Sequence, residues 1–315
     1  MDGLRNRQQS YTGRGVLLVL AFILTGCGGS APSLTGEEIQ ARNPKHTYVE
    51  IDGVALHYQQ TGLGRPLIFI HGLLEDYRIW RHITPGLTYG NTVYELDLMG
   101  FGLSEKPQDK TYDLDTYLAQ LTTYIENFHL ENIILAGHDF GAVIAAAYAL
   151  QSPANVHKLI LMSAPISAHE SLPLNIRLLG VPLIGSLLSG DWFLKRILQE
   201  GVFDKQVMSD AMVKQYLEPF EDDPGARAAL HKFLREFDLA RVVEEDILPN
   251  LSALTMPTLL LYGGQDQFTS MDVARELDVA IPSADLQVVT RSGHYLLEDR
   301  PEDVRQQIKE WIDKD

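Results

Sequence analysis

The sequence is poor in cysteine and in basic residues, and its N-terminal apolar run is short. Its 315 residues include one cysteine, Cys27, so no internal disulfide can form. It has 26 lysines and arginines against 42 aspartates and glutamates, which argues against a nucleic-acid-binding protein because such proteins need a basic surface. It also has no Cys/His metal spacing, no P-loop and no dinucleotide fingerprint, so we expect no metal and no cofactor.

The first residues are typical of an export signal. Three arginines precede an apolar run of ten residues at 16–25, "VLLVLAFILT", which is too short to span a bilayer. The run leads into "LTGC", which resembles a bacterial lipobox, where lipid is attached to the cysteine sulfur after cleavage. We therefore predict a lipoprotein signal peptide at residues 1–26 and a membrane anchor on Cys27. An ordinary signal peptide that happens to contain a cysteine is the alternative.

The location predicted from this signal is the cell envelope. Gly28 follows the cysteine, where an aspartate would favour retention at the inner membrane, so we expect the outer membrane. Residues 27–45 are rich in glycine, serine and proline and are predicted to form a tether.

The remaining chain alternates between short apolar runs and amphipathic segments. "RPLIFIHG", "NIILAG" and "KLILMSAP" are predicted to be buried strands, and the stretches between such runs have apolar residues at helical spacing. This alternation predicts an α/β fold with a mostly parallel sheet flanked by helices. Residues 166–250 interrupt it with helix-like segments, so we expect a helical insertion after the sixth strand. The core is then 46–165 and 251–315.

The segment "GHDFG" at residues 137–141 has the spacing of G-x-S-x-G, the strand-to-helix turn that displays a nucleophile. Asp139 occupies the serine position. An isolated aspartate there could simply cap the following helix. However, Asp266 and His294 each follow a later predicted strand, so all three side chains are expected at the same edge of the sheet. Asp266 is then expected to orient the imidazole of His294.

These motifs carry a family resemblance. From about residue 47 to 313, the chain resembles the α/β-hydrolase superfamily, in the branch of epoxide hydrolases and haloalkane dehalogenases. The motifs are "HGLLEDYRIW", "DLMGFGLSEKP", "GHDFG", "YGGQD" and "SGHYLLEDRP". The order of nucleophile, acid and histidine is that of this superfamily. The insertion at 166–250 is similar in place and length to the family's helical cap.

An aspartate nucleophile narrows the chemistry. Attack on an ester carbonyl would form an anhydride, whereas attack on a saturated carbon gives an alkyl ester of Asp139. His294, backed by Asp266, would then activate a water to hydrolyse this ester. The backbone N–H groups of Leu73 and Phe140 would stabilise the oxyanion. We expect a small, apolar-leaning substrate; the sequence does not predict the oligomeric state.

The group that assists the leaving group stays open. For an epoxide, the resemblance implies a pair of cap tyrosines, and Tyr216 is the only tyrosine of the insertion. For a halide it implies N–H donors, and Trp192 is the candidate because Phe140 follows the nucleophile where a tryptophan is expected. We favour an epoxide-hydrolase-like reaction. A haloalkane-dehalogenase-like reaction and a non-catalytic ligand-binding homologue are the alternatives.

Overall fold

The computed structural model describes residues 33–169 and 171–314. The predicted signal peptide, Cys27, Gly28 and the first part of the predicted tether lie outside these residues. Part of the predicted tether is helical: α2 (Gly36–Arg42) begins after Thr35, which forms a capping box with Glu38. Within the described ranges, none of the helices is both long and apolar enough to cross a membrane.

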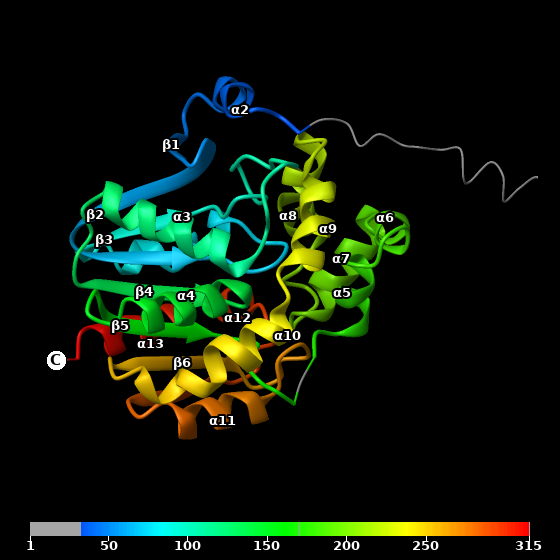
Figure 1. The fold of residues 1–315 in the computed structure, drawn as a ribbon. Coiled ribbons are helices and arrows are strands. Elements are labelled where there is room, and N and C mark those ends of the chain that lie inside the picture. Colours follow the sequence, from blue (N-terminus) through cyan, green and yellow to red (C-terminus); the bar gives the residue numbers. More distant parts are fainter. Residues whose placement is uncertain (1–32, 170, 315) are drawn as a thin grey trace, which may run out of the picture. The chain divides into compact units, whose positions relative to one another are not determined.

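A seven-stranded sheet forms the centre of the molecule (Figure 1). Its order is β1-β2-β4-β5-β6-β7, with β3 paired to β2; β1 is antiparallel to β2, and the other neighbours are parallel. The strands are β1 (Thr47–Ile51), β2 (Val54–Ile70), β3 (Tyr89–Leu96), β4 (Ile133–His138), β5 (Val156–Met162), β6 (Thr258–Gly263) and β7 (Ala284–Val289).

Strand β2 is long and serves as two strands. Its second half runs parallel to β3, with Ile70 opposite Leu96, while Tyr58 of its first half also lies opposite Leu96. A Cβ on Gly64 would lie 2.0 Å from the Gly90 carbonyl oxygen, so only glycine allows this close approach. The predicted strand "RPLIFIHG" is therefore the second half of β2, and "KLILMSAP", the sixth strand after which the insertion is predicted, is β5.

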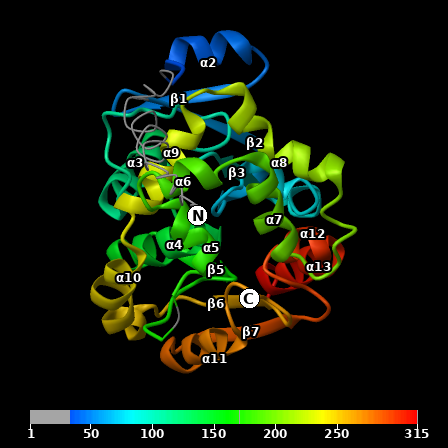
Figure 2. The same cartoon turned by 90° about the vertical axis from the view of Figure 1, so that its right-hand side faces the viewer.

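Helices cover both faces of the sheet. Helices α3 (Leu114–Asn127) and α4 (Phe140–Gln151) lie together on one side, and α12 (Leu296–Asp299) and α13 (Pro301–Ile312) lie on the other (Figure 2). Helix α11 (Met271–Ala280) packs on β6 and β7. Helix α4 is buried around its whole circumference, which explains its alanine-rich, non-periodic sequence.

A group of helices lies between β5 and β6. The prediction of a mostly parallel sheet flanked by helices, with a helical cap after the sixth predicted strand, is confirmed. After α9 the chain returns to the core, where the two short helical segments that follow α10 pack on α4. These helices are α5 (Leu174–Leu179), α6 (Ile184–Leu188), α7 (Asp191–Glu200), α8 (Asp210–Asp222), α9 (Ala226–Glu236) and α10 (Leu239–Arg241), followed by turns at Val242–Ile247 and Leu248–Ala253.

Candidate active site

Asp139 lies in the tight turn between β4 and α4. Its backbone has φ 51° and ψ −122°, a conformation that costs energy for any residue with a side chain. The turn needs both flanking glycines, because a Cβ on Gly137 would lie 2.3 Å from the Gly141 carbonyl oxygen and one on Gly141 would lie 2.2 Å from that of Ile70. The Asp139 side chain makes no capping hydrogen bond to α4. The carboxylate is therefore not a helix cap.

The structure brings Asp266 and His294 to Asp139. Asp266 follows β6 and His294 follows β7. His294 Nδ1 lies 3.0 Å from Asp266 Oδ2, and His294 Nε2 lies 3.7 Å from Asp139 Oδ1. Asp266 Oδ1 accepts hydrogen bonds from the backbone N–H groups of Phe268, at 2.8 Å, and Thr269, at 3.0 Å. These bonds fix the carboxylate that orients the imidazole.

The electrostatics of the three groups are linked. Burial disfavours the charged imidazole, but the carboxylates of Asp266 and Asp139 outweigh it and raise the pKa of His294 to about 9. Burial raises the pKa of Asp139, against the opposing charge of His294. Burial alone would raise the pKa of Asp266 too, but the charge and hydrogen bond of His294 lower it. The positive charge of His294 and the negative charges of the two aspartates therefore stabilise one another.

The loop after β2 supplies a backbone hydrogen-bond donor to Asp139. The Leu73 N–H donates to Asp139 Oδ2 at 2.9 Å. A Cβ on the preceding Gly72 would lie 2.6 Å from the Asp139 Cβ, so the loop approaches the nucleophile through a glycine. Phe140, the other predicted oxyanion residue, is the first residue of α4 and is buried.

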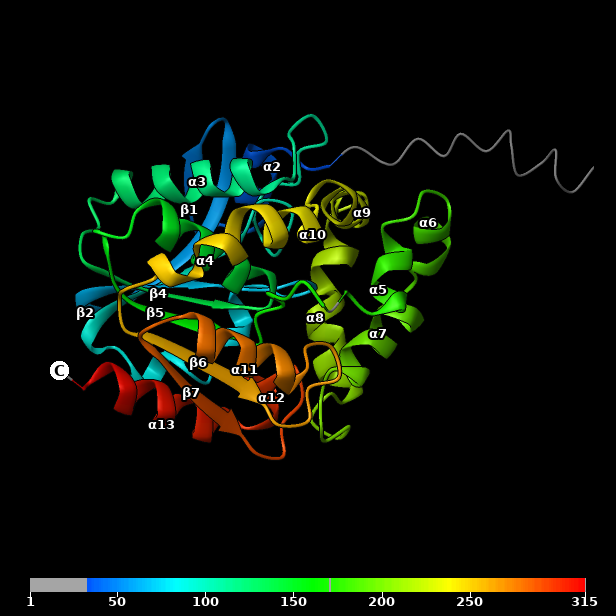
Figure 3. The ribbon, with the colours of Figure 1, turned by 60° about the horizontal axis from the view of Figure 1, so that its bottom comes forward.

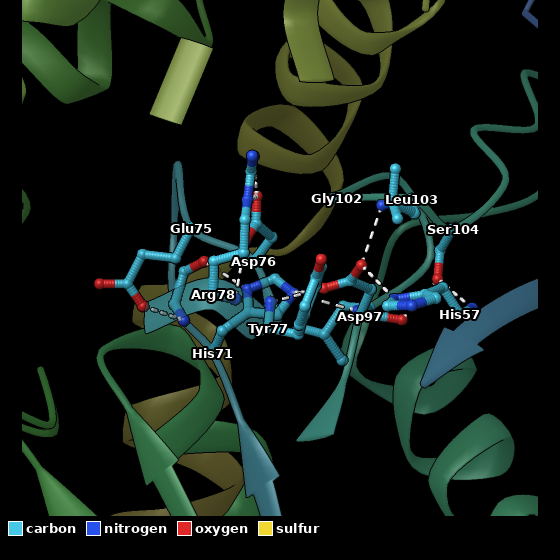
Figure 4. Close-up of polar contacts among 12 residues, drawn as sticks. His57, His71, Glu75, Asp76, Tyr77, Arg78, Asp97, Gly102, Leu103 and Ser104 are labelled. Carbon is cyan, nitrogen blue, oxygen red and sulfur yellow. Dashed lines mark hydrogen bonds and ion pairs between the residues drawn. The ribbon is translucent and has the colours of Figure 1, made fainter. Parts of the chain in front are cut away.

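A cluster of hydrogen-bonded side chains, including His57, His71 and Asp97, lies beside this loop (Figure 4). His71 Nδ1 donates to the Gly72 carbonyl oxygen at 2.9 Å, and His71 Nε2 accepts from the Leu98 N–H at 3.1 Å. Asp97 accepts from the Tyr77 N–H at 2.7 Å and from His57 Nδ1 at 2.8 Å. These hydrogen bonds hold the loop after β2, and none of the residues that form them lines the pocket.

A second buried pair, not found from the sequence, links this loop to His294. Glu75 Oε2 accepts from the Gly72 N–H at 2.6 Å and from His138 Nδ1 at 3.0 Å. His138 Nε2 lies 3.0 Å from the His294 carbonyl oxygen. The imidazole of His138 therefore bridges Glu75 and the backbone of His294. The only sequence signal is that Glu75 and His138 lie within two predicted motifs.

The pocket above Asp139 is mostly apolar. It lies between the core and α5, α7 and α10. Apart from Asp139 and His294, its polar lining residues all carry a hydroxyl group. Its lining residues are Leu73, Leu74, Asp139, Phe140, Pro165, Ser167, Ser171, Leu172, Pro173, Ile176, Ile197, Leu239, Phe268, Thr269, Val273, His294 and Tyr295.

Neither predicted leaving-group donor lines this pocket. The Tyr216 hydroxyl donates instead to Glu298 Oε1 at 2.7 Å, and Arg81 bonds the same carboxylate. The Trp192 side chain lies on the outside of the cap, 64% exposed. Both differences arise from how the cap helices pack, which the sequence did not show. Tyr295, the residue after His294, lines the pocket instead, and its ring centroid lies 5.5 Å from that of His294.

Comparison with known proteins shows which family the chain belongs to. Residues 67–307 match the model of the family described as "Alpha/beta hydrolase family". The uncharacterized hydrolase YugF of Bacillus subtilis is 28% identical over 270 residues, covering 83% of this chain and 96% of YugF. Epoxide hydrolase 3 of Xenopus tropicalis is 26% identical over 295 residues, covering 86% of this chain and 78% of that protein. A meta-cleavage product hydrolase from Pseudomonas fluorescens has a similar fold, with TM-score 0.75 and 22% identity over 84% of this chain and 97% of that one.

Proposed function

The chain belongs to the alpha/beta hydrolase family, and we propose that within it the protein opens an epoxide through a covalent ester on Asp139. The observation that carries this proposal is the carboxylate itself. It lies at the turn between β4 and α4, caps no helix, and has the Leu73 N–H on one oxygen and His294 beside the other. A carboxylate in this position is a nucleophile for saturated carbon.

In the first step, Asp139 Oδ1 attacks an epoxide carbon and the ring C–O bond breaks. The Oδ2 atom, held by the Leu73 N–H at 2.9 Å, becomes the carbonyl oxygen of the resulting ester. The former ring oxygen stays on the neighbouring carbon as an alkoxide and takes a proton from the Tyr295 phenol, which regains one from solvent. No base is required in this step, because the carboxylate is already ionised.

In the second step, His294 removes a proton from water, and the water oxygen adds to the Asp139 carboxyl carbon. Forming the ester removes the negative charge of Asp139, one of the two carboxylates that raise the pKa of His294. The imidazole then loses its proton more readily, so the base becomes available when it is needed. The oxyanion develops on Oδ2, where the Leu73 N–H stabilises it together with the Phe140 N–H. When it collapses, the bond between the carboxyl carbon and Oδ1 breaks, and the diol leaves with the proton that His294 had taken; the water oxygen remains as the new carboxylate oxygen of Asp139.

The pocket favours an epoxide over a halide. A halide leaving group needs N–H donors, and among the described lining residues only His294 carries a side-chain N–H. An epoxide needs one proton donor, and we assign this role to Tyr295, which lines the pocket. Burial raises the pKa of Tyr295, which keeps this phenol protonated. The relationship to epoxide hydrolase 3 points the same way.

The test is to trap the ester. A His294→Gln variant retains the nucleophile but has no base, so incubation with an epoxide should add the mass of one epoxide molecule to the intact protein. An Asp139→Ala, His294→Gln double variant is the control and should gain nothing. If haloalkanes label the single variant and epoxides do not, dehalogenation replaces the proposed reaction. Saturable binding without adduct or product would indicate a ligand-binding homologue.

We also propose that the protein is a lipoprotein of the outer membrane, anchored through Cys27. The support is the sequence alone: the apolar run at 16–25, the "LTGC" motif and Gly28. Metabolic labelling with a fatty acid should mark the chain, and Cys27→Ser should abolish the label. A variant that retains the label would contradict the proposed site, and label recovered with the inner membrane would contradict the location.

A further inference from the structure

The cap carries an exposed apolar surface, which we call the cap face. It consists of Val181, Leu183, Ile184, Leu187 and Trp192 on and around α6 and the start of α7. Leu183 and Leu187 are 81% and 80% exposed, and Trp192 is 64% exposed. Single exposed apolar residues are ordinary, but five of them within twelve residues of the chain indicate an interaction site.

The cap face is also nearly free of charge, in a chain with a net charge of −16. Between residues 172 and 193 the only charged side chains are Arg177 and Asp191. Asp191 is neutralised by Arg227, whose guanidinium lies 2.5 Å from its carboxylate. A surface without unpaired acid can approach an anionic lipid headgroup layer, whereas the rest of this acidic protein is repelled by it.

The described chain begins beside the cap. A Cβ on Gly225 would lie 2.4 Å from the Ser33 Cβ, so Ser33 packs against the turn between α8 and α9. Two residues later, Arg227 bonds the Ser189 carbonyl oxygen, in the turn between α6 and α7. Ser33 therefore lies on the cap, close to the cap face. Cys27 is six residues earlier, so a lipid on its sulfur is within roughly 20 Å of Ser33 by covalent reach.

We propose that the cap face docks on a lipid bilayer. Helices α5, α6 and α7 are the outermost elements on their side of the molecule (Figure 3). Leucines with a tryptophan on the outer side of short helices are the composition that enters the interface between headgroups and acyl chains. The cap face supplies a second attachment beside the predicted lipid, and the proposal does not depend on the chemistry at Asp139.

Docking would also bring the pocket to the membrane. Helix α5 precedes the cap face, and its inner residue Ile176 lines the pocket together with Leu172. The docked surface and the pocket wall therefore belong to the same short segment. This arrangement suits an apolar substrate dissolved in the bilayer.

Trp192 provides a direct probe. The chain has three tryptophans, and the other two, Trp80 and Trp311, are 0% and 5% exposed. We would incorporate the full anchored protein into phosphatidylcholine–phosphatidylglycerol vesicles whose acyl chains carry bromine, a contact quencher of indole fluorescence. We expect a loss of tryptophan emission relative to unbrominated vesicles, and Trp192→Phe should remove most of that loss.

The variants decide between bilayer docking and other occupants. Leu183→Asp with Leu187→Asp should abolish the quenching, while Val279→Asp, at a side chain 87% exposed on α11, should leave it unchanged. Equal emission in the two kinds of vesicle would overturn the proposal. A second outcome would also overturn it: the protein is a dimer in detergent and the double aspartate variant is a monomer. The cap face would then bind a second copy of the chain. Turnover of a water-soluble epoxide, which tests only the active site, should be equal in all these variants.

Discussion

At the scale of single residues, the main question is which hydroxyl assists the leaving group. Tyr295 lines the pocket beside His294, while Tyr216 is bonded to Glu298 outside it. We predict that Tyr295→Phe slows ester formation by about 100-fold or more, the range of general acid catalysis. Single-turnover kinetics with an epoxide would measure this step. Tyr216→Phe is the matched control and should leave the rate unchanged; equal losses in both variants would contradict the role of Tyr295.

The charge of His294 makes stability depend on pH. Its pKa rises from 6.5 to about 9 on folding. A raised pKa gives stability that is complete below the unfolded value and is lost as the pH rises through the folded value. Between about pH 6 and pH 10, we expect this group to remove on the order of 3 kcal/mol from the free energy of unfolding. Urea unfolding at several pH values would measure this loss. The unfolding free energy of His294→Gln should depend less on pH than that of the wild type.

At the scale of elements, the turn between β4 and α4 is held by close backbone contacts. A Cβ on Gly141 would lie 2.2 Å from the Ile70 carbonyl oxygen. We predict that Gly141→Ala lowers the free energy of unfolding by about 2–3 kcal/mol, the cost of overpacking. Gly264→Ala is the control, because its nearest contact would be a side-chain atom at 3.3 Å. Chemical denaturation should show a much smaller loss of unfolding free energy for Gly264→Ala than for Gly141→Ala.

The cap is attached to the core by a partly buried ionic cluster. Arg81 bonds Glu298, whose side chain is 2% exposed and also accepts from Tyr216 of α8. We predict that Arg81→Met destabilises by about 3 kcal/mol, because it leaves a buried carboxylate without its cation. Hydrogen exchange should then increase first in α8. Arg275→Met, which removes an exposed pair with Asp272, should change little; similar effects in both would show that the cluster does not hold the cap.

At the scale of the whole molecule, the sequence predicts the core far better than the cap. Asp139, Asp266 and His294 each follow a strand, and strand ends in a parallel sheet share one edge, so their approach could be foreseen. Tyr216 and Trp192 lie on amphipathic helices, where a shift of one residue turns a side chain from the pocket to solvent. The packing of α7 and α8 decides this, and no local pattern encodes it. The Glu75–His138 pair was missed for a similar reason, since it joins a loop and the end of β4, which are distant in sequence.

The net charge of the whole molecule should set the salt dependence of membrane docking. The chain carries a charge of −16, yet the cap face presents apolar side chains. We predict that a chain beginning at Gly28, without lipid, binds phosphatidylglycerol-containing vesicles more strongly as salt rises. Between roughly 0.01 and 0.1 M salt the Debye length falls from about 30 to about 10 Å, which screens the repulsion while apolar contact persists. Co-sedimentation would measure it, with neutral phosphatidylcholine vesicles as the control that should show little salt effect. Binding that weakens with salt would instead indicate attraction by basic residues, and the cap face would then not be the docking surface.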